Sequence, residues 1–369
     1  MINWDEIIAP AKRENNTKRA FVAVNRLQGK HVPTAPGEAM DMFAELAKVL
    51  QARYQERLLV IGFAETATAV ALAVAQALNC LSMTTTRENL PHVQYFYFSE
   101  SHSHAMEQKL VREDLERAMG QVERIVIVED EITTGNTILH LLRLLRQEYG
   151  AACPAMTAAS LLNGMDEEAM ALFAREQVDC VFLHKYTPAV YEKRMEQAVP
   201  EGTAWDVRGG SGTEVPEIHI YEGNLELRRL QDAGEIARQC DGLLAVLERE
   251  CSFAQGERVL VLGTEEFMYP ALWIGRQLQQ AGCQVWCHAT TRSPIVPSPQ
   301  EDYPLHSRWC LRSLYDEGRV TYLYNLTRYD SVLLLTDADT ESAAGLADLT
   351  AALRQTGNER IRIVEWRRL

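Results

Sequence analysis

Apolar residues recur along the chain at two spacings, and each spacing predicts one kind of element. Residues 36–54 open with Pro36 and repeat apolar residues at helical intervals, whereas residues 58–61 form a wholly apolar run ending at Gly62. The other elements predicted in the first half are helices over 66–78 and 137–149 and strands over 93–98, 125–128 and 156–162. Strands and helices in this order predict an α/β fold, a mainly parallel sheet flanked by helices.

A second set of such elements follows residues 207–216, a glycine-rich stretch that ends in Pro216. The elements predicted after it are strands over 259–262, 284–289 and 332–335 and helices over 268–281 and 342–355. A chain of 369 residues is long enough for two domains. We therefore expect one domain over residues 1–206 and another over residues 217–369, with the boundary in this stretch.

Three segments of the first half recur in the second half in the same order. They are Arg57–Glu65 with Arg258–Glu266, Thr85–Arg87 with Thr290–Arg292, and Ile125–Asp130 with Val332–Asp337. Chance likeness is the alternative, since strands of parallel sheets resemble one another, but the shared order favours duplication. The sequence therefore predicts two related lobes, of which the second is degenerate.

Two adjacent acids, Glu129 and Asp130, follow the apolar strand. The carboxyl ends of parallel strands form the ligand-binding edge of such a sheet, where carboxylates accept hydrogen bonds from ribose hydroxyls or hold a divalent cation. The turn that follows consists of Thr133, Thr134, Gly135, Asn136 and Thr137. Its hydroxyl and N–H groups at a helix start suit a phosphate dianion. A merely capped helix is the alternative, but it leaves the paired acids unexplained.

The run VIVEDEITTGNT, residues 126–137, resembles the ribose-phosphate signature of type I phosphoribosyltransferases. The resemblance implies that Glu129 and Asp130 are catalytic and hold the ribose hydroxyls of 5-phosphoribosyl-1-pyrophosphate (PRPP), and that residues 133–137 bind its 5-phosphate. It also implies Mg²⁺, which would reach the two acids indirectly, as part of Mg–PRPP. Enzymes acting on hypoxanthine or guanine carry Asp where this chain has Thr133, which weakens that assignment.

The same resemblance extends to two other segments of the first half. It implies a pyrophosphate-binding loop made of Phe63, Ala64, Glu65 and Thr66. It also implies a catalytic role for Arg87, which would lie near the loop that closes over the substrate.

A narrower resemblance rests on three motifs, Gly29–Pro33, Ser101–Ala105 and Thr291–Pro294. Together they resemble the hallmarks of phosphoribosyltransferase-like proteins with a C-terminal TRSP domain, a family found in bacterial tellurium-resistance-associated gene clusters. The resemblance implies transfer of ribose 5-phosphate from PRPP to an unidentified base or similar small acceptor, in the synthesis of a nucleotide-like metabolite. A PRPP-binding regulator without turnover is the alternative.

Polar residues outside the main motif give further candidates in the first half. His102 and His104 lie in the polar segment 99–108, either as acid–base or metal-binding groups of a lid or as solvent-exposed loop residues. Lys30 and His31 either cover the pyrophosphate or belong to an ordinary surface loop.

The second lobe has its own candidates. Glu266, Arg292 and Ser293 indicate a separate pocket in which Arg292 pairs with an anionic group, and a pure scaffold is the alternative. Glu341 stands where a phosphate would bind, so this lobe is not expected to bind PRPP.

Composition and charge limit the partners. The formal net charge of −14 disfavours a nucleic-acid partner, and the apolar runs are too short to cross a membrane. Eight scattered cysteines are typical of reduced thiols and indicate a cytoplasmic protein. The expected partners are therefore PRPP and a small-molecule acceptor, and a homodimer stays open.

Overall fold

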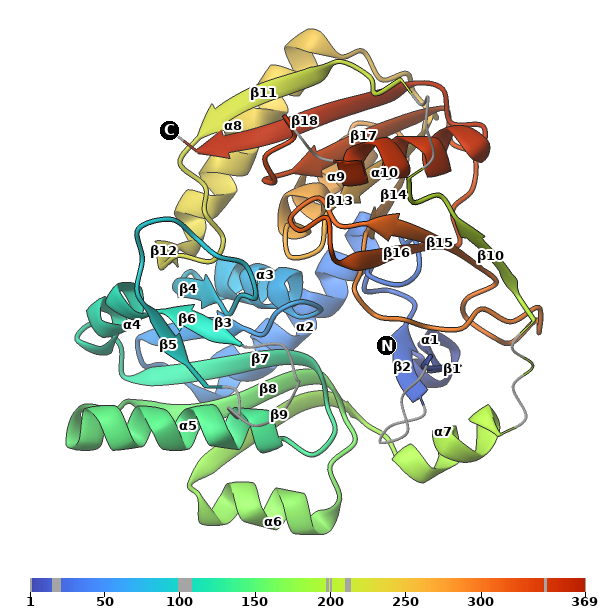
Figure 1. The fold of residues 1–369 in the computed structure, drawn as a ribbon. Helices are drawn as coiled ribbons and strands as arrows, with labels where there is room; N and C mark the ends of the chain where they lie inside the picture. Colours follow the sequence, from blue (N-terminus) through green and yellow to red (C-terminus); the bar gives the residue numbers. More distant parts are fainter. Residues whose placement is uncertain are drawn as a thin grey trace. The chain divides into compact units, whose positions relative to one another are not determined.

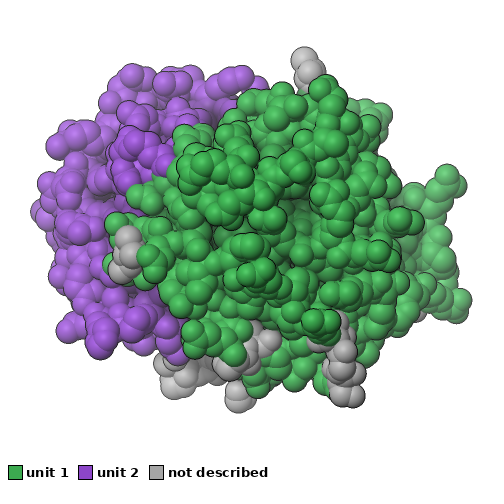
Figure 2. Space-filling model, turned by 90° about the horizontal axis from the view of Figure 1, so that it is seen from above, with its two compact units in different colours: residues 1–40, 189–225, 239–369 green, residues 41–188, 226–238 purple. Residues whose placement is uncertain are grey.

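The computed structural model describes residues 2–14, 21–98, 108–196, 199, 201–209, 214–341 and 344–368. The chain forms two compact units, drawn in green and purple in Figure 2. Unit 1 (green) comprises residues 1–40, 189–225 and 239–369, and unit 2 (purple) comprises residues 41–188 and 226–238. The units interleave along the chain, whereas each of the two expected domains is continuous.

Unit 2 is built on a six-stranded sheet in the order β12-β4-β3-β7-β8-β9, in which only β12 is antiparallel to its neighbour. The strands are β3 (Leu58–Gly62), β4 (Leu81–Thr84), β7 (Arg124–Ile132), β8 (Ala155–Asn163), β9 (Val178–Lys185) and β12 (Gln231–Asp232). The associated helices are α2 (Pro36–Arg53, which begins in unit 1), α3 (Thr68–Leu78), α4 (Arg112–Met119), α5 (Asn136–Tyr149) and α6 (Glu167–Arg175). A separate hairpin pairs β5 (Tyr95–Tyr97) with β6 (Lys109–Val111).

Helices cover both faces of this sheet, with α3 on one face and α5 and α6 on the other (Figure 1). Right-handed crossovers that leave β3 and β7 in opposite directions require this arrangement. β3 is buried along its whole length, and the alanine-rich α3 packs closely against it. A Cβ atom on Gly62 would lie 2.5 Å from that of Ala71, so only glycine fits at the end of β3.

Unit 1 contains a five-stranded parallel sheet in the order β11-β18-β17-β13-β14. The strands are β11 (Ile218–Gly223), β13 (Arg258–Gly263), β14 (Gln284–Ala289), β17 (Ser331–Thr336) and β18 (Ile361–Arg368). Its helices are α1 (Trp4–Ile7), α7 (Pro188–Met195), α8 (Ala233–Glu250, which begins in unit 2), α9 (Tyr269–Gln280) and α10 (Ala344–Gln355). Two smaller sheets complete it, β1 (Ile8–Lys12) with β2 (Phe21–Asn25), and β10 (Thr203–Asp206) with β15 (Ser307–Arg312) and β16 (Val320–Tyr324).

The two main sheets repeat one arrangement of four strands. The order is β4-β3-β7-β8 in unit 2 and β14-β13-β17-β18 in unit 1. At equivalent places, Thr85 N donates to Gly62 O at 2.8 Å and Thr290 N donates to Gly263 O at 3.2 Å. The three recurring sequence segments therefore occupy corresponding positions, in agreement with the predicted pair of related lobes.

The β5–β6 hairpin of unit 2 and the β15–β16 hairpin of unit 1 also correspond to each other. Thr86 forms an antiparallel bridge with Lys109, and Thr291 forms one with Tyr322. The residues that follow these two threonines, Arg87 and Arg292, are therefore also equivalent.

The most important difference from the predicted elements concerns β7. The strand does not end at Val128 but continues to Ile132, so Glu129 and Asp130 lie inside it. The ladder with β8 continues past the buried core and pairs Glu129 with Ser160. Because polar side chains at a sheet edge do not interrupt backbone pairing, the end of the apolar run was a poor guide to the end of the strand.

The predicted helices agree with the structure to within two residues at each end. α3 begins at Thr68 rather than 66, and α5 begins at Asn136 rather than 137. Among the helices that the structure describes, none is both long and apolar enough to span a bilayer.

Candidate active site

The predicted acid pair lies at the carboxyl end of β7, a central strand of the unit 2 sheet. Asp130 Oδ1 accepts a hydrogen bond at 2.7 Å from Thr66 Oγ1, in the loop between β3 and α3. Glu129 and Asp130 are both half-buried. The structure therefore brings the acid pair and the predicted pyrophosphate loop to one edge of the sheet, where a ligand can reach them.

The electrostatic surroundings of Glu129 connect it to Arg87. Burial raises the pKa of Glu129 well above its ordinary value, the negative charge of Asp130 raises it further, and the positive charge of Arg87 opposes both effects. The positive charge of Arg87, which follows β4, therefore acts on Glu129. A cationic group at this edge would favour the ionised form of Glu129.

This pKa shift predicts a pH-dependent stability. Between the ordinary and the raised pKa, the folded chain holds a proton on Glu129 that the unfolded chain has lost, so the free energy of unfolding falls as pH rises through this window. We expect Glu129→Gln to unfold at a higher temperature than the unchanged protein near neutral pH, with the difference vanishing below the ordinary pKa of glutamate. Thermal unfolding measured over a pH series tests this, and parallel curves at all pH values would contradict it.

The predicted phosphate turn leads directly into α5, which begins at Asn136. Gly135 has φ +71°, and a Cβ atom there would lie 2.4 Å from the ring of the buried Phe173. Thr134 and Thr137 are exposed, and Thr134 Oγ1 accepts a hydrogen bond at 3.4 Å from Asn136 N, the first N–H group of α5. The turn thus has the form of an anion site, with glycine required by both conformation and space.

The loop between β3 and α3 is held by internal hydrogen bonds. Phe63 N donates to Val128 O at 3.0 Å, and Ala64 N donates to Thr85 Oγ1 at 2.8 Å. The peptide bond between Ala64 and Glu65 is cis. The amides of Phe63 and Ala64 are therefore committed within the protein and shape the loop.

A residue of the predicted lid segment 99–108 also shapes this loop. Gln108 Oε1 accepts from Thr85 Oγ1 at 2.8 Å, and Gln108 Nε2 donates to Ala64 O at 3.2 Å. Thr85 could be noticed through its recurrence in the second half, but no local pattern distinguishes Gln108.

Of the predicted lid segment 99–108, Gln108 is among the described residues. His102 and His104 lie outside the described residues, as does the rest of segment 99–107.

In unit 1, the charged residues at the equivalent edge are paired with one another. Arg292 Nε donates to Glu265 Oε2 at 2.5 Å, and Arg292 Nη2 donates to Glu266 Oε1 at 3.4 Å. Arg319 Nη1 also donates to Glu265 Oε2, at 3.0 Å, and Ser313 Oγ donates to Glu265 Oε1. Glu265 and Glu266 are 1% and 2% exposed. The anionic group beside Arg292 is thus a carboxylate pair of the same unit.

The other second-lobe candidates also have partners within unit 1. Ser293 O accepts from Tyr324 OH at 2.6 Å, and Asp337 Oδ1 accepts from Tyr315 OH at 2.6 Å. Glu341 is exposed and lies 3.6 Å from Arg367 Nη2. These contacts describe a polar edge that is linked internally.

The alternative that Lys30 and His31 belong to an ordinary surface loop was wrong. Lys30 is fully buried and His31 is 2% exposed, within unit 1. Lys30 Nζ donates to Glu265 O at 2.6 Å and to Thr290 O at 3.1 Å. A lysine can be buried because its ammonium is hydrogen-bonded to carbonyl oxygens beside acidic side chains.

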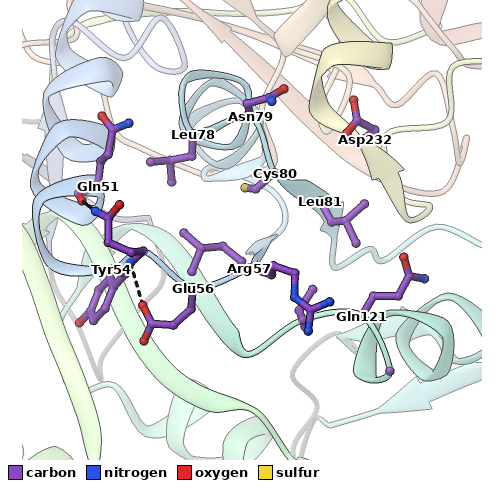
Figure 3. Close-up of a pocket in the computed structure, with 14 residues that line it drawn as sticks. Gln51, Tyr54, Glu56, Arg57, Leu78, Asn79, Cys80, Leu81, Gln121 and Asp232 are labelled. Atoms are coloured by element: carbon purple, nitrogen blue, oxygen red, sulfur yellow. Dashed lines mark hydrogen bonds between the residues drawn. The ribbon is translucent and has the colours of Figure 1, made fainter.

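A hollow of about 590 Å³ lies elsewhere on unit 2 (Figure 3). It is found where β3 and β4 begin, at Leu58 and Leu81, and therefore at the sheet edge opposite the acid pair. Its lining includes the carboxylates of Glu56 and Asp232, whose charge disfavours a phosphate. The candidate site is therefore defined by the chemistry around β7 and not by this hollow.

Two family models match the chain. Residues 7–184 match a family described as phosphoribosyl transferase, and residues 229–353 match the TRSP domain described as C-terminal to that family. No curated protein matches the chain in sequence.

Several solved structures match about half of the chain. One is adenine phosphoribosyltransferase from Trypanosoma brucei in complex with AMP, pyrophosphate and ribose-5-phosphate, with 15% identity and a TM-score of 0.34, covering 49% of this chain and 77% of that one. Another is adenine phosphoribosyltransferase from Rhodothermus marinus, with 16% identity and a TM-score of 0.35, covering 50% and 96%. The enzyme from Giardia lamblia has 11% identity, a TM-score of 0.35 and the same two coverages.

Proposed function

The chain belongs to the phosphoribosyltransferase-like proteins that carry a C-terminal TRSP domain, and we propose that it transfers ribose 5-phosphate from PRPP to a nitrogenous base or similar acceptor, with release of pyrophosphate. The observation that carries this proposal is the position of the acid pair on β7. Asp130 bonds to Thr66 on one side, and the strand continues into the glycine turn at Gly135 on the other. A diol site between two anion sites matches the order of groups in PRPP.

Different residues of unit 2 would bind different parts of PRPP. The α5 N-terminus and the hydroxyls of the turn would bind the 5-phosphate. Glu129 and Asp130 would accept hydrogen bonds from the ribose hydroxyls and stabilise the positive charge that develops on the ring as the bond to pyrophosphate breaks. Arg87 would balance the acid pair and attract the pyrophosphate. The acceptor's nitrogen then attacks C1, so no covalent enzyme intermediate is needed.

Mg²⁺ fits this site only as a partner of the substrate. Among the described residues, no group of three or more His, Cys, Asp or Glu side chains is arranged to hold a metal. Oxygens of PRPP would coordinate the ion, and Glu129 and Asp130 would reach it indirectly, through the ribose hydroxyls that they hold. Bound in this way, Mg²⁺ would neutralise charge on the leaving pyrophosphate.

Pyrophosphate release tests the proposed reaction. The full chain, PRPP and Mg²⁺ are incubated with a panel of purine, pyrimidine and other nitrogen heterocycles, and we expect pyrophosphate release that depends on one class of acceptor. PRPP with Mg²⁺ should also raise the unfolding temperature by preferential binding to the folded state. Stabilisation without release for any acceptor would instead favour the PRPP-binding regulator, and the absence of both would reject the PRPP site.

A further inference from the structure

Gln108 and Thr85 together hold both backbone groups of Ala64. Thr85 Oγ1 accepts from Ala64 N at 2.8 Å and donates to Gln108 Oε1 at 2.8 Å. Gln108 Nε2 closes the ring by donating to Ala64 O at 3.2 Å. We call this closed set of three hydrogen bonds the Ala64 clasp. Fixing the N–H and C=O groups of one residue restricts rotation of the peptide planes on either side of it.

The same device occurs in the other unit with a different side chain. Glu265, equivalent to Ala64, donates its N–H to Thr290 Oγ1 at 3.1 Å, as Ala64 does to Thr85. Its carbonyl oxygen accepts from Lys30 Nζ, which also donates to Thr290 O. Lys30 comes from a distant part of the chain. It is not the residue of unit 1 that is equivalent in position to Gln108. The backbone of the equivalent loop residue is thus held in both units, by Gln108 in unit 2 and by Lys30 in unit 1.

The position of the clasp indicates its role. Ala64 begins the turn that carries Glu65 and Thr66 towards the acid pair, and Thr66 Oγ1 reaches Asp130. A loop that binds an anion through backbone groups is effective only if those groups are already oriented, because reorienting them on binding costs entropy. Gln108 is also attached to the β5–β6 hairpin, since its carbonyl oxygen accepts from Phe98 N at 3.2 Å.

We infer that Gln108 is a positioning residue for pyrophosphate: through the Ala64 clasp it holds the loop after β3 in the conformation that binds the pyrophosphate group of PRPP. This inference rests on the proposed function. The inference distinguishes the two ends of the substrate, because the clasp is part of the predicted pyrophosphate loop and none of its three hydrogen bonds involves the turn at 133–137. Loss of the clasp should therefore weaken binding of pyrophosphate but not of ribose 5-phosphate.

The test compares three ligands by calorimetry on the full chain with Mg²⁺: inorganic pyrophosphate, PRPP and ribose 5-phosphate. Gln108→Met keeps the length of the side chain and removes both of its hydrogen bonds. We expect the affinity of the Gln108→Met protein for pyrophosphate and PRPP to fall roughly tenfold, because the variant loses two hydrogen bonds that orient the loop. Its affinity for ribose 5-phosphate should be unchanged. Gln121→Met is the matched control, since Gln121 Nε2 donates to Arg117 O at 3.0 Å away from this loop; it should leave all three affinities unchanged.

A second variant keeps the test decisive if Gln108→Met impairs folding. Thr85→Val is nearly isosteric, breaks the clasp from its other side, and should produce the same selective loss. Equal affinity for pyrophosphate in a folded Gln108→Met or Thr85→Val protein overturns the inference, as does an equal loss for ribose 5-phosphate. If the unchanged protein binds none of the three ligands, the proposed function fails and this inference fails with it.

Discussion

Asp130→Asn is expected to lower the affinity for Mg–PRPP roughly 30- to 100-fold, because it removes the charge from hydrogen bonds to the ribose hydroxyls, each worth about 1.5–3 kcal/mol. The fold should persist, since asparagine is nearly isosteric and its carbonyl oxygen can still accept from Thr66 Oγ1. Calorimetric titration of PRPP in the presence of Mg²⁺ gives the affinity, and thermal unfolding reports on the fold.

Asp179→Asn is the control for this prediction. Asp179 lies at the start of β9 in the same unit, is largely exposed, and is 3.3 Å from Arg124 Nη1. It undergoes the same change of charge far from the carboxyl end of β7. Its affinity for PRPP should equal that of the unchanged protein, and equal affinities in all three proteins would remove Asp130 from the site.

Glu265→Ala is expected to destabilise unit 1 by about 3–5 kcal/mol, the cost of breaking a buried ion pair by removing one partner. The carboxylate of Glu265 receives hydrogen bonds from two arginines and a serine and is almost inaccessible to water. Without it, Arg292 keeps its longer contact of 3.4 Å with Glu266, and Arg319 keeps one of 3.6 Å with Asp316, in a medium of low dielectric constant. The free energy of unfolding in urea measures the effect.

Glu45→Ala provides the comparison for an exposed pair. Glu45 lies 2.6 Å from Lys48 on the surface of α2, with half of its side chain exposed. Such exposed pairs are screened by water and contribute little to stability, so the unfolding curve should hardly move. If Glu265→Ala were equally harmless, the cluster around Arg292 would contribute nothing to the stability of unit 1.

The central strands were predictable from the sequence because they are buried on both faces. β3 and β17 are buried at every position and therefore appear as uninterrupted apolar runs between turns. β15 and β16 have no such signal, because they alternate between buried and half-buried positions and include Trp, Tyr and Arg. β12 is still less visible, since two polar residues pair with β4 from a distant part of the chain.

The acids of the candidate site were predictable, whereas their partners were not. Glu129 and Asp130 stand out because paired carboxylates rarely follow a core strand without a function. The bond from Thr66 to Asp130 spans 64 positions, and Gln108 reaches Ala64 across 44. Contacts over such separations depend on strand order, which local spacing does not encode. Lys30 misled the prediction for the same reason, since lysine is rarely buried unless distant groups solvate its charge.

The contacts of Lys30 limit how the gene for this protein can be divided. The first 40 residues belong to unit 1 together with residues 239–369, although nearly two hundred residues separate them in the sequence. A gene interrupted between the two family segments would produce a C-terminal polypeptide in which Glu265 O and Thr290 O lose the ammonium that binds them. Such a polypeptide would depend on the other product to complete its structure.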